Sequence, residues 1–215
     1  AEVDFHSAPE TLHEGAIHMV EGVAYEVRRL DWEGHKAYVA RVEAEYFTTA
    51  EQHSEVKVLD RFDGLKAGIE LSEYGEVRIR RRIVGFKKIK FDTSENLGFS
   101  ELDMPEQEMV TTAHWFSLPA GLYRRLDVAP GEVAEGLAGI AHAMHGMATL
   151  LLMCDMRDLG RCIGDRSGGW FAPHLIEGAP VFDDMSNAGG ASPAAGENSE
   201  PTLFIYDNFP GGIGL

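Results

Sequence analysis

Cysteine, cationic residues and long apolar runs are scarce in this sequence, and each shortage excludes a class of protein. Cys154 and Cys162 are the only cysteines among 215 residues. Two thiols exclude a disulfide-rich scaffold and a four-thiolate zinc site within the chain, and they favour a reducing compartment, the cytoplasm. The longest apolar stretch runs only from Ala148 to Cys154. A membrane span needs roughly 18 residues, so we expect no membrane contact.

Motifs for nucleotide chemistry are also missing. No lysine stands in a Gly-rich phosphate-binding loop, and no dinucleotide fingerprint follows a strand. We therefore expect no nucleotide hydrolysis, no catalytic residue, no metal site and no cofactor in this chain by itself. The first ten residues are acidic and polar and include no Met. They are no secretory signal, and they indicate a processed chain or a piece of a longer one.

What the sequence does contain is the composition of a globular protein, with 44% hydrophobic and 25% charged residues. Asp and Glu number 35 against 19 Lys and Arg, which gives a net charge of −16. A uniformly acidic surface repels nucleic acid. The placement of the few cations therefore matters more than the total charge.

The first half of the chain predicts short β-strands. Residues 15–47 are typical of a three-stranded meander, with a turn at 31–34 in which Gly34 is expected at positive φ. Residues 55–60 alternate as a fourth strand, and residues 76–91 predict two more strands, bent at Gly85. Strands at this spacing favour a small barrel or sandwich.

The second half adds one strong helix to further strands. An irregular acidic connection is expected to about residue 108, followed by a strand at 109–118. A helix should open at Pro130 and end near Leu152, because apolar residues recur every three or four positions between them. These apolar positions are Val133, Leu137, Ile140, Met144, Met147 and Leu151.

The end of the chain predicts a mobile loop at 186–200, rich in Gly, Ala, Ser and Pro, and a buried strand at 202–206. The whole pattern predicts an α+β fold with two parts. Residues 1–118 form a β-rich, barrel- or sandwich-like subdomain. In residues 119–215 a long helix packs on a second small sheet.

Two groups of residues only superficially resemble chemical sites. The loop at 164–169 imitates a serine-nucleophile turn, but Arg166 would displace the hydroxyl from the backbone donors that it needs. The second group consists of histidines, cysteines and an aspartate that could in principle bind zinc, but their spacing matches no compact zinc motif. We favour the interpretation that the histidines are hydrogen-bonded residues of the core or of an interface. The residues of this second group are His142, His145, Cys154, Asp155 and Cys162.

The segment after the helix admits two interpretations. Asp155 and Asp158 flank Arg157, and two carboxylates around one arginine suit a general acid/base pair. More often such a group is a buried ion pair that fixes the exit of a helix, and we favour that structural role.

The strongest physical signal is a basic stretch from Glu76 to Lys90, which holds seven Lys and Arg against one acid. Alternation places Arg78, Arg80 and Arg82 on one face of a strand, about 6 to 7 Å apart, which suits a phosphate backbone. A cationic edge strand, or one paired with the protein's own acids, explains the same pattern equally well.

If this stretch binds nucleic acid, its side chains have distinct roles. Arginine and lysine would hold phosphate oxygens, and an aromatic ring would stack on an unpaired base. The candidate residues are Arg78, Arg80, Arg82, Lys87 and Lys88 for phosphate, with Phe86 or Trp115 for stacking.

The last residues carry a more specific motif. Residues 206–214, YDNFPGGIG, resemble the Y-D-x-x-P-G-G-x-G signature in the C-terminal, MrfA zinc-binding module region of YprA/MrfA-type helicases, which are superfamily 2 DEAD/DEAH-box proteins. Residues 154–160, CDMRDLG, agree with the same family, and weaker agreement is scattered over nearly all of the chain. The motif residues are Asp155, Arg157, Asp158, Gly160, Tyr206, Asp207, Pro210, Gly211 and Gly212.

The resemblance implies an ATP-dependent 3′-to-5′ DNA helicase of DNA repair, with ATP, Mg and Zn bound by the parent protein. Its two motor lobes would precede residue 1. The zinc-binding cysteines of the family normally follow the Pro-Gly-Gly motif, and we expect the sequence to be truncated before them. Neither ATPase residues nor zinc ligands are therefore carried over to this chain.

The leading hypothesis is a non-catalytic C-terminal accessory region of such a helicase. It would help to bind or guide single-stranded DNA and contact the motor lobes of the same parent chain. Gly211 and Gly212 would make the tight turn of the motif. The alternative is a protein-docking module of a helicase or an anti-phage complex, which uses an exposed apolar face and makes no direct DNA contact.

Overall fold

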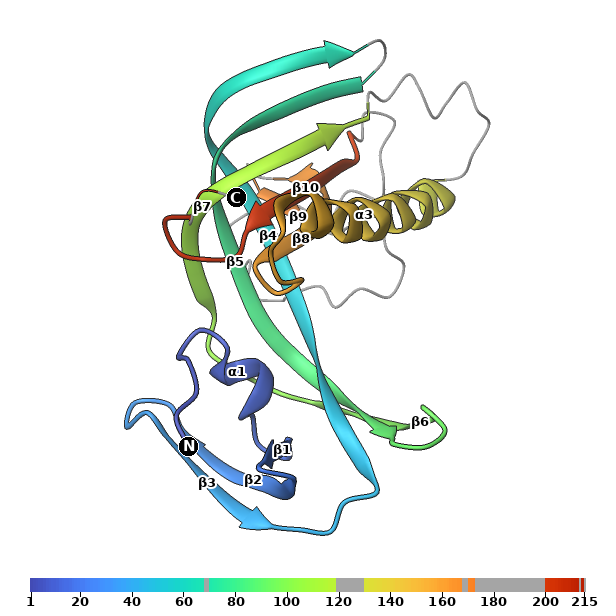
Figure 1. Cartoon of the computed structure of the whole chain (residues 1–215). Helices are drawn as coiled ribbons and strands as arrows, with labels where there is room; N and C mark the ends of the chain where they lie inside the picture. Colours follow the sequence, from blue (N-terminus) through green and yellow to red (C-terminus); the bar gives the residue numbers. More distant parts are fainter. Residues whose placement is uncertain (68–69, 119–129, 168–169, 173–199, 213, 215) are drawn as a thin grey trace. The chain divides into compact units, whose positions relative to one another are not determined.

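The computed structural model describes residues 1–67, 70–118, 130–167, 170–172, 200–212 and 214. These residues form mostly β-structure with few helices (Figure 1). The predicted mobile loop at 186–200 lies outside the described residues except for Glu200. The elements are α1 (Ala8–Thr11), β1 (Ile17–Val20), β2 (Val23–Asp31), β3 (Lys36–Arg41), β4 (Tyr46–Ala67), β5 (Glu70–Lys90), β6 (Asn96–Glu101), β7 (Gln107–Ser117), α3 (Pro130–Leu152), β8 (Leu159–Ser167), β9 (Trp170–Ala172) and β10 (Thr202–Asp207).

The predicted meander is confirmed as an antiparallel three-stranded sheet in the order β1-β2-β3. The prediction for its turn is wrong in one detail, because His35, not Gly34, adopts the positive φ, at 51°. The carboxylate of Asp31 explains the difference. It accepts the Gly34 N–H at 2.8 Å and caps the turn, so the left-handed residue comes one position later.

The basic stretch belongs to one long strand, not to two strands bent at Gly85. β5 continues through Gly85, which pairs with Glu101 of β6. A side chain at Gly85 would overlap the ring of Phe99, so this glycine provides room for an aromatic side chain from the neighbouring strand. The expected irregular connection to residue 108 is likewise wrong, because β6 forms a hairpin with β5 inside it.

The second sheet has seven strands in the order β4-β9-β8-β10-β7-β5-β6, with an additional pairing of β4 with β5. The expected barrel- or sandwich-like first half is therefore not observed. Strands from the first half, β4, β5, β6 and β7, lie in the same sheet as β8, β9 and β10 from the second half. The confirmed strands at 109–118 and 202–206 are neighbours, and Phe204 pairs with Trp115 in their register.

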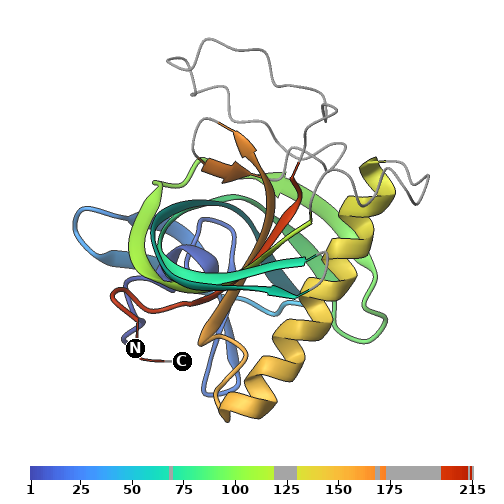
Figure 2. The ribbon, with the colours of Figure 1, turned by 90° about the horizontal axis from the view of Figure 1, so that it is seen from above.

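The described helix α3 has the predicted bounds, from Pro130 to Leu152. It packs on β8 and β10 (Figure 2), so it covers the seven-stranded sheet and not a separate second one. Its buried positions, Leu137, Ala141, His145 and Thr149, recur every four residues. The predicted apolar stripe is only partly buried, since Met147 and Leu151 are 63% and 78% exposed.

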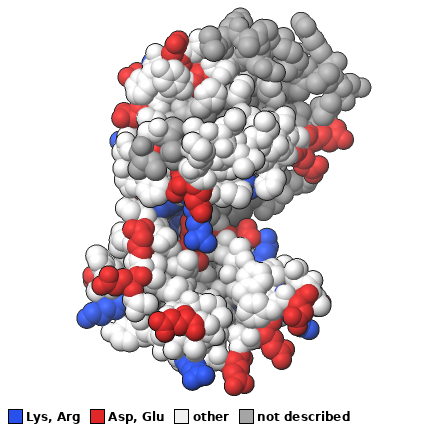
Figure 3. Space-filling model, viewed as in Figure 1, with Lys and Arg blue, Asp and Glu red and all other residues white. Residues whose placement is uncertain are grey.

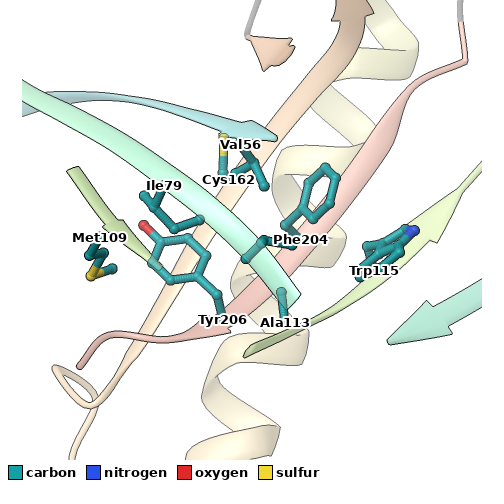
Figure 4. Packing of buried hydrophobic residues seen from close by; sticks show 9 residues of the cluster. Val56, Ile79, Met109, Ala113, Trp115, Cys162, Phe204 and Tyr206 are labelled. Atoms are coloured by element: carbon teal, nitrogen blue, oxygen red, sulfur yellow. The ribbon is translucent and has the colours of Figure 1, made fainter. Parts of the chain in front are cut away.

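Chain contacts divide the protein into two units. Unit 1 contains Ala1–His53 and Arg81–Gln107, and unit 2 contains Ser54–Arg80 and Glu108–Leu215. The main core belongs to unit 2, where Val56, Ile79, Trp115, Phe204 and Tyr206 pack together with other apolar side chains (Figure 4). Burial of these side chains supplies the main driving force for folding of this unit. No described helix combines the length and apolar character that crossing a bilayer requires.

Candidate nucleic-acid interface

The predicted alternation along β5 is confirmed by its burial pattern. Val77, Ile79 and Ile83 are buried, while Arg78, Arg80 and Arg82 on the other face are half-buried. Arg81 lies with the apolar residues, and its guanidinium donates to Gln107 Oε1 at 3.2 Å and to the His6 carbonyl at 3.1 Å. Arg81 therefore has a structural role in unit 1.

Arg80 is engaged by an acid of its own protein. Its Nε donates to Glu55 Oε2 at 3.0 Å, and its Nη2 contacts the same oxygen. The side chains are only 22% and 8% exposed. A buried carboxylate needs a partner of opposite charge, and Arg80 is that partner for Glu55. The main role of Arg80 is therefore structural, and the residue is less suited to bind a ligand.

The lysines at the end of β5 lie in unit 1 and differ in their partners. Lys87 Nζ lies 2.6 Å from Glu51 Oε1, in a half-exposed ion pair. Lys88 Nζ lies 5.6 Å from the centroid of the Tyr46 ring and 5.9 Å from that of Phe86. Rings hold a cation without neutralising it, so Lys88 keeps its full charge for a ligand.

The two rings that the sequence suggested for base stacking are both inside the protein. Phe86 is buried against the ring of His13, with 4.6 Å between centroids. Trp115 is 1% exposed, and its Nε1 donates to Glu73 Oε2 at 3.0 Å. Neither ring has a free face for a base, so we do not retain Phe86 and Trp115 as stacking residues.

Exposed rings lie elsewhere in unit 1. Phe47 and Phe91 are 36% and 46% exposed, and their ring centroids are 5.7 Å apart. Sequence reasoning missed both. Phe91 directly follows the last lysine of the basic stretch, and this adjacency is the signal that would have found it.

The charged side chains on one face of the molecule are mostly acidic (Figure 3). On the face shown in Figure 3, acidic side chains are scattered over the described surface and basic ones are fewer. Since the chain carries a net charge of −16, any contact with nucleic acid has to use a local cluster of cations.

The segment after α3 is held by hydrogen bonds from backbone N–H groups to side-chain carboxylates, and the expected buried ion pair is not observed among its described residues. Asp158 Oδ2 accepts the Asp155 N–H at 2.8 Å, and Asp155 Oδ1 accepts the Arg157 N–H at 2.9 Å. Asp155 and Arg157 are exposed. The two carboxylates therefore close a turn, which explains their spacing without acid/base chemistry.

The terminal motif packs on this same turn. The Asn208 N–H donates to the Asp158 carbonyl at 2.8 Å, and Asn208 Nδ2 donates to the Arg157 carbonyl at 3.0 Å. Asp207 is buried and its Oδ1 accepts the Phe209 N–H at 3.1 Å. The two family motifs thus form one structural element.

Glycine is required in the terminal motif by its backbone. Gly211 and Gly212 have φ values of 82° and 73°, in the left-handed region. The Gly212 N–H donates to the Phe209 carbonyl at 2.9 Å, which closes the turn after Pro210. The turn predicted for these glycines is present.

The described residues do not form a metal site. No three His, Cys, Asp or Glu side chains among them gather closely enough to hold an ion. Cys162 is buried, and this burial, with the charge of Glu55 adding to it, raises the pKa of the thiol to about 12, far from the thiolate that zinc prefers. His145 Nε2 bonds the Leu159 carbonyl at 2.9 Å, as a core histidine does.

An apolar groove lies in unit 2, between α3 and the sheet. Its volume is about 570 Å³. The helix contributes Met144, Met147, Ala148, Leu151 and Leu152, and the sheet contributes rings and aliphatic groups such as Phe62, Tyr74 and Ile205. Exposed apolar surface of this extent is typical of a site that contacts another protein surface.

Comparisons with known proteins agree with the motifs. No protein-family model matches the sequence. The chain is 33% identical over 215 residues to a protein of Bacillus subtilis (strain 168) described as an uncharacterized ATP-dependent helicase, YprA, and it spans 24% of that relative.

Two crystal structures of the DUF1998 helicase MrfA are similar over nearly the whole chain. One, of MrfA bound to DNA, has a TM-score of 0.55 and 30% identity and covers 99% of this chain. The other, of MrfA, has a TM-score of 0.55 and 25% identity and covers 100%. The chain spans about a quarter of MrfA in both, 24%. The chain is therefore homologous to one region of the YprA/MrfA-type helicases, the family that its terminal motif indicated.

Proposed function

We propose that this chain is a non-catalytic accessory region of an ATP-dependent 3′-to-5′ DNA helicase and helps to bind or guide single-stranded DNA. The observation that carries the proposal is the match, over 99% of the chain, to a quarter of a helicase whose crystal structure contains DNA. The sequence contains no nucleotide-binding motif. The energy of ATP would therefore be used by other parts of the parent protein.

The residues proposed to contact DNA are cations of β5, and the two lysines near its end are the strongest candidates. From Val77 through Phe91 the sequence contains no acid. Lys88 is held by rings and not by a carboxylate, and Lys87 shares a half-exposed pair that water and salt weaken. Arg78 and Arg82 remain candidates on the half-buried face of the strand. Arg80 is the weakest candidate because its guanidinium is already paired with the Glu55 carboxylate.

The experiment is a salt titration of binding between the 215-residue chain and a fluorescein-labelled single-stranded DNA, followed by anisotropy. For the unchanged chain the affinity should fall steeply between about 50 and 200 mM salt. Lys87→Gln/Lys88→Gln should lower the slope of log affinity against log salt by roughly 0.7 for each phosphate that the variant no longer neutralises.

The matched control is Lys36→Gln, which removes an exposed cation on β3 in the same unit. It should leave both affinity and slope unchanged. No binding by the unchanged chain at the lowest salt, or an equal slope for the double variant, would contradict the proposal.

The homology to YprA/MrfA-type helicases also suggests the role of the parent protein, which is part of the same proposal. We place the chain in a cytoplasmic DEAD/DEAH-box helicase of DNA repair, beside the motor lobes of the same polypeptide, with ATP, Mg and Zn held elsewhere in it. The test is the full-length helicase with Lys87→Gln/Lys88→Gln. It should keep its basal ATPase rate without DNA and need more single-stranded DNA for stimulation.

The apolar groove favours a second function, docking to a helicase or an anti-phage complex without direct DNA contact. Leu151→Lys places a charge in the groove, whereas Ile140→Lys changes an exposed residue of the same helix outside it. If docking is the function, Leu151→Lys abolishes binding of the chain to the separately produced remainder of its parent helicase and Ile140→Lys does not. Retained docking by both variants would exclude the groove.

A further inference from the structure

The helix α3 has no charged side chain over most of its length. Its acids, Glu132 and Glu135, lie near its start, and the sequence contains no Asp, Glu, Lys or Arg between Gly136 and Cys154. A helix that is apolar on every side is typical of a helix that is covered on every side. The sheet covers one side of α3, through the buried residues at positions 137, 141, 145 and 149. The opposite side is exposed, although its composition is that of a buried surface.

The exposed side is most apolar in the last turns of the helix and directly after it, where Leu150 and Met153 are 79% and 90% exposed. It continues into the groove between α3 and the sheet, to which the sheet contributes the exposed rings of Phe62 and Tyr74. A continuous apolar surface of this kind marks a site that contacts another protein surface. We define the apolar face of α3 as Ala143, Met147, Leu150, Leu151 and Met153.

The composition of the apolar face indicates a permanent partner. Interfaces that form and separate keep a polar rim, whereas permanent interfaces resemble a protein core cut in half. The spacing of Ala143, Met147 and Leu150 by four and three residues is the spacing with which two helices pack along each other. A helix with an apolar stripe of its own therefore matches this face.

The homologous helicases are long enough to supply such a helix. The chain spans only 24% of YprA and of MrfA, so most of each relative lies outside the matched region. A segment of the same polypeptide is present at an effective concentration on the order of millimolar, which a second copy of the protein would have to match in solution. Covalent connection therefore favours a helix of the parent protein over a second copy.

We propose that the apolar face of α3 is covered by a helix of the parent helicase that lies outside this chain, and that α3 thereby joins unit 2 permanently to another part of the same polypeptide. This inference rests on the part of the proposed function that places the chain within a longer helicase, and not on contact of this chain with DNA. DNA does not fit the face, because the helix offers phosphate no Lys or Arg from Gly136 onwards.

The experiment measures how fast N-ethylmaleimide modifies a cysteine at position 150. Leu150→Cys, with Cys154→Ser to remove the neighbouring thiol, is compared in the 215-residue chain and in the full-length parent helicase, and peptide mass spectrometry assigns the label. In the 215-residue chain the new thiol should react nearly as fast as in denaturant. In the parent it should react roughly tenfold or more slowly, because labelling then requires local opening. The buried Cys162 gives the rate of a protected thiol in both proteins.

A charge on the apolar face separates a specific cover from a general slowing in the larger protein. Met153→Lys, added to Leu150→Cys, should raise the labelling rate in the parent towards that of the 215-residue chain, because burial of an ammonium group is costly. The matched control is Met19→Lys, which places the same charge at an exposed position of β1 in unit 1 and should leave labelling at position 150 unchanged. If Leu150→Cys does not fold, Met147→Cys, which is also exposed, replaces it.

A photoreactive benzoylphenylalanine in place of Leu150 identifies the covering segment. On irradiation, the full-length parent should form a cross-link within one polypeptide, to a peptide outside the 215 residues. A cross-link between two polypeptides would show a second copy on the face, and a cross-link to a peptide of the 215 residues would show that the chain covers itself. Either result overturns the inference.

The labelling rates also separate this inference from the proposed contact with DNA. Equal rates in the 215-residue chain and the parent overturn the inference, because the face would then be open in both. Slow labelling in the 215-residue chain also overturns it, because the cover would then not come from the rest of the parent. Both results leave the proposed DNA contact standing, whereas a salt titration without DNA binding removes that contact and leaves the inference about α3 unaffected.

Discussion

The ring of Tyr206 lies directly on the backbone of Gly160. The two residues are register partners on β10 and β8, and a β-carbon at Gly160 would overlap the atoms Cε2 and Cζ of the tyrosine ring. Tyr206 belongs to the terminal motif and Gly160 to the segment after α3. The contact therefore explains why each of the two family motifs contains this residue type: glycine in one accommodates the ring of the other.

Gly160→Ala should destabilise unit 2. The added methyl group has to displace a ring that is buried in the core, and overpacking of this kind costs about 1 to 3 kcal/mol. The measurement is the free energy of unfolding in urea. Gly139→Ala is the matched control, because a β-carbon there meets no atom within 4 Å and alanine favours the helix by about 1 kcal/mol. A Gly160→Ala variant as stable as the unchanged chain would show that the ring moves freely.

Arg80→Ala should destabilise the chain much more than the loss of an exposed arginine. It leaves the buried Glu55 carboxylate without its guanidinium partner, at a cost of about 3 to 5 kcal/mol. Arg28→Ala breaks the exposed pair with Glu26 and should cost less than about 1 kcal/mol. Urea unfolding compares the two variants, and a similar loss in both would mean that Glu55 finds another partner.

His13 should make the stability of unit 1 depend on pH. Its ring is fully buried, and burial lowers the pKa below 6.5, against a smaller opposing effect of the Glu14 carbonyl. The folded state therefore disfavours the protonated ring, whereas the unfolded chain binds a proton near pH 6.5. The contribution of neutral His13 to stability is complete above that pH and is lost as the pH falls towards the lowered pKa, with a slope of at most about 1.4 kcal/mol per pH unit.

His13→Gln should flatten this loss of stability between pH 7 and pH 5, as measured by urea unfolding at each pH. Burial also lowers the pKa of His114, so a smaller dependence on pH should persist. A His13→Gln variant with the original slope would contradict the assignment.

The two cysteines should differ sharply in reactivity. Burial, with a smaller effect of Glu55, raises the pKa of Cys162 to about 12, so its thiol stays protonated at neutral pH. Cys154 is half-buried. Ellman's reagent should therefore modify Cys154 in the folded chain and both cysteines after denaturation, because the thiolate is the reactive form. Rapid modification of both thiols in the folded chain would contradict the buried position of Cys162.

Local patterns in the sequence were sufficient for individual elements. The spacing of apolar residues after Pro130 predicted a helix with the observed bounds, and alternation placed Arg78 and Arg82 opposite Ile79 and Ile83. Both patterns depend on neighbours within one element, where backbone geometry fixes which side chains share a face. The tight turn at Gly211 and Gly212 could also be predicted from the sequence, because few residues other than glycine adopt the left-handed backbone conformation.

Ion pairs and hydrogen bonds between residues far apart in the chain could not be predicted from such local patterns. Nothing local to Arg80 indicates Glu55, and nothing local to Trp115 indicates that Glu73 binds its indole. The sequence alone established an acidic α+β protein with one basic strand and a family motif. The tertiary structure decided which cations of that strand are paired with acids of the same protein and which aromatic rings are exposed. Burial and ion pairing depend on residues of different strands, and these residues meet only when the sheet forms.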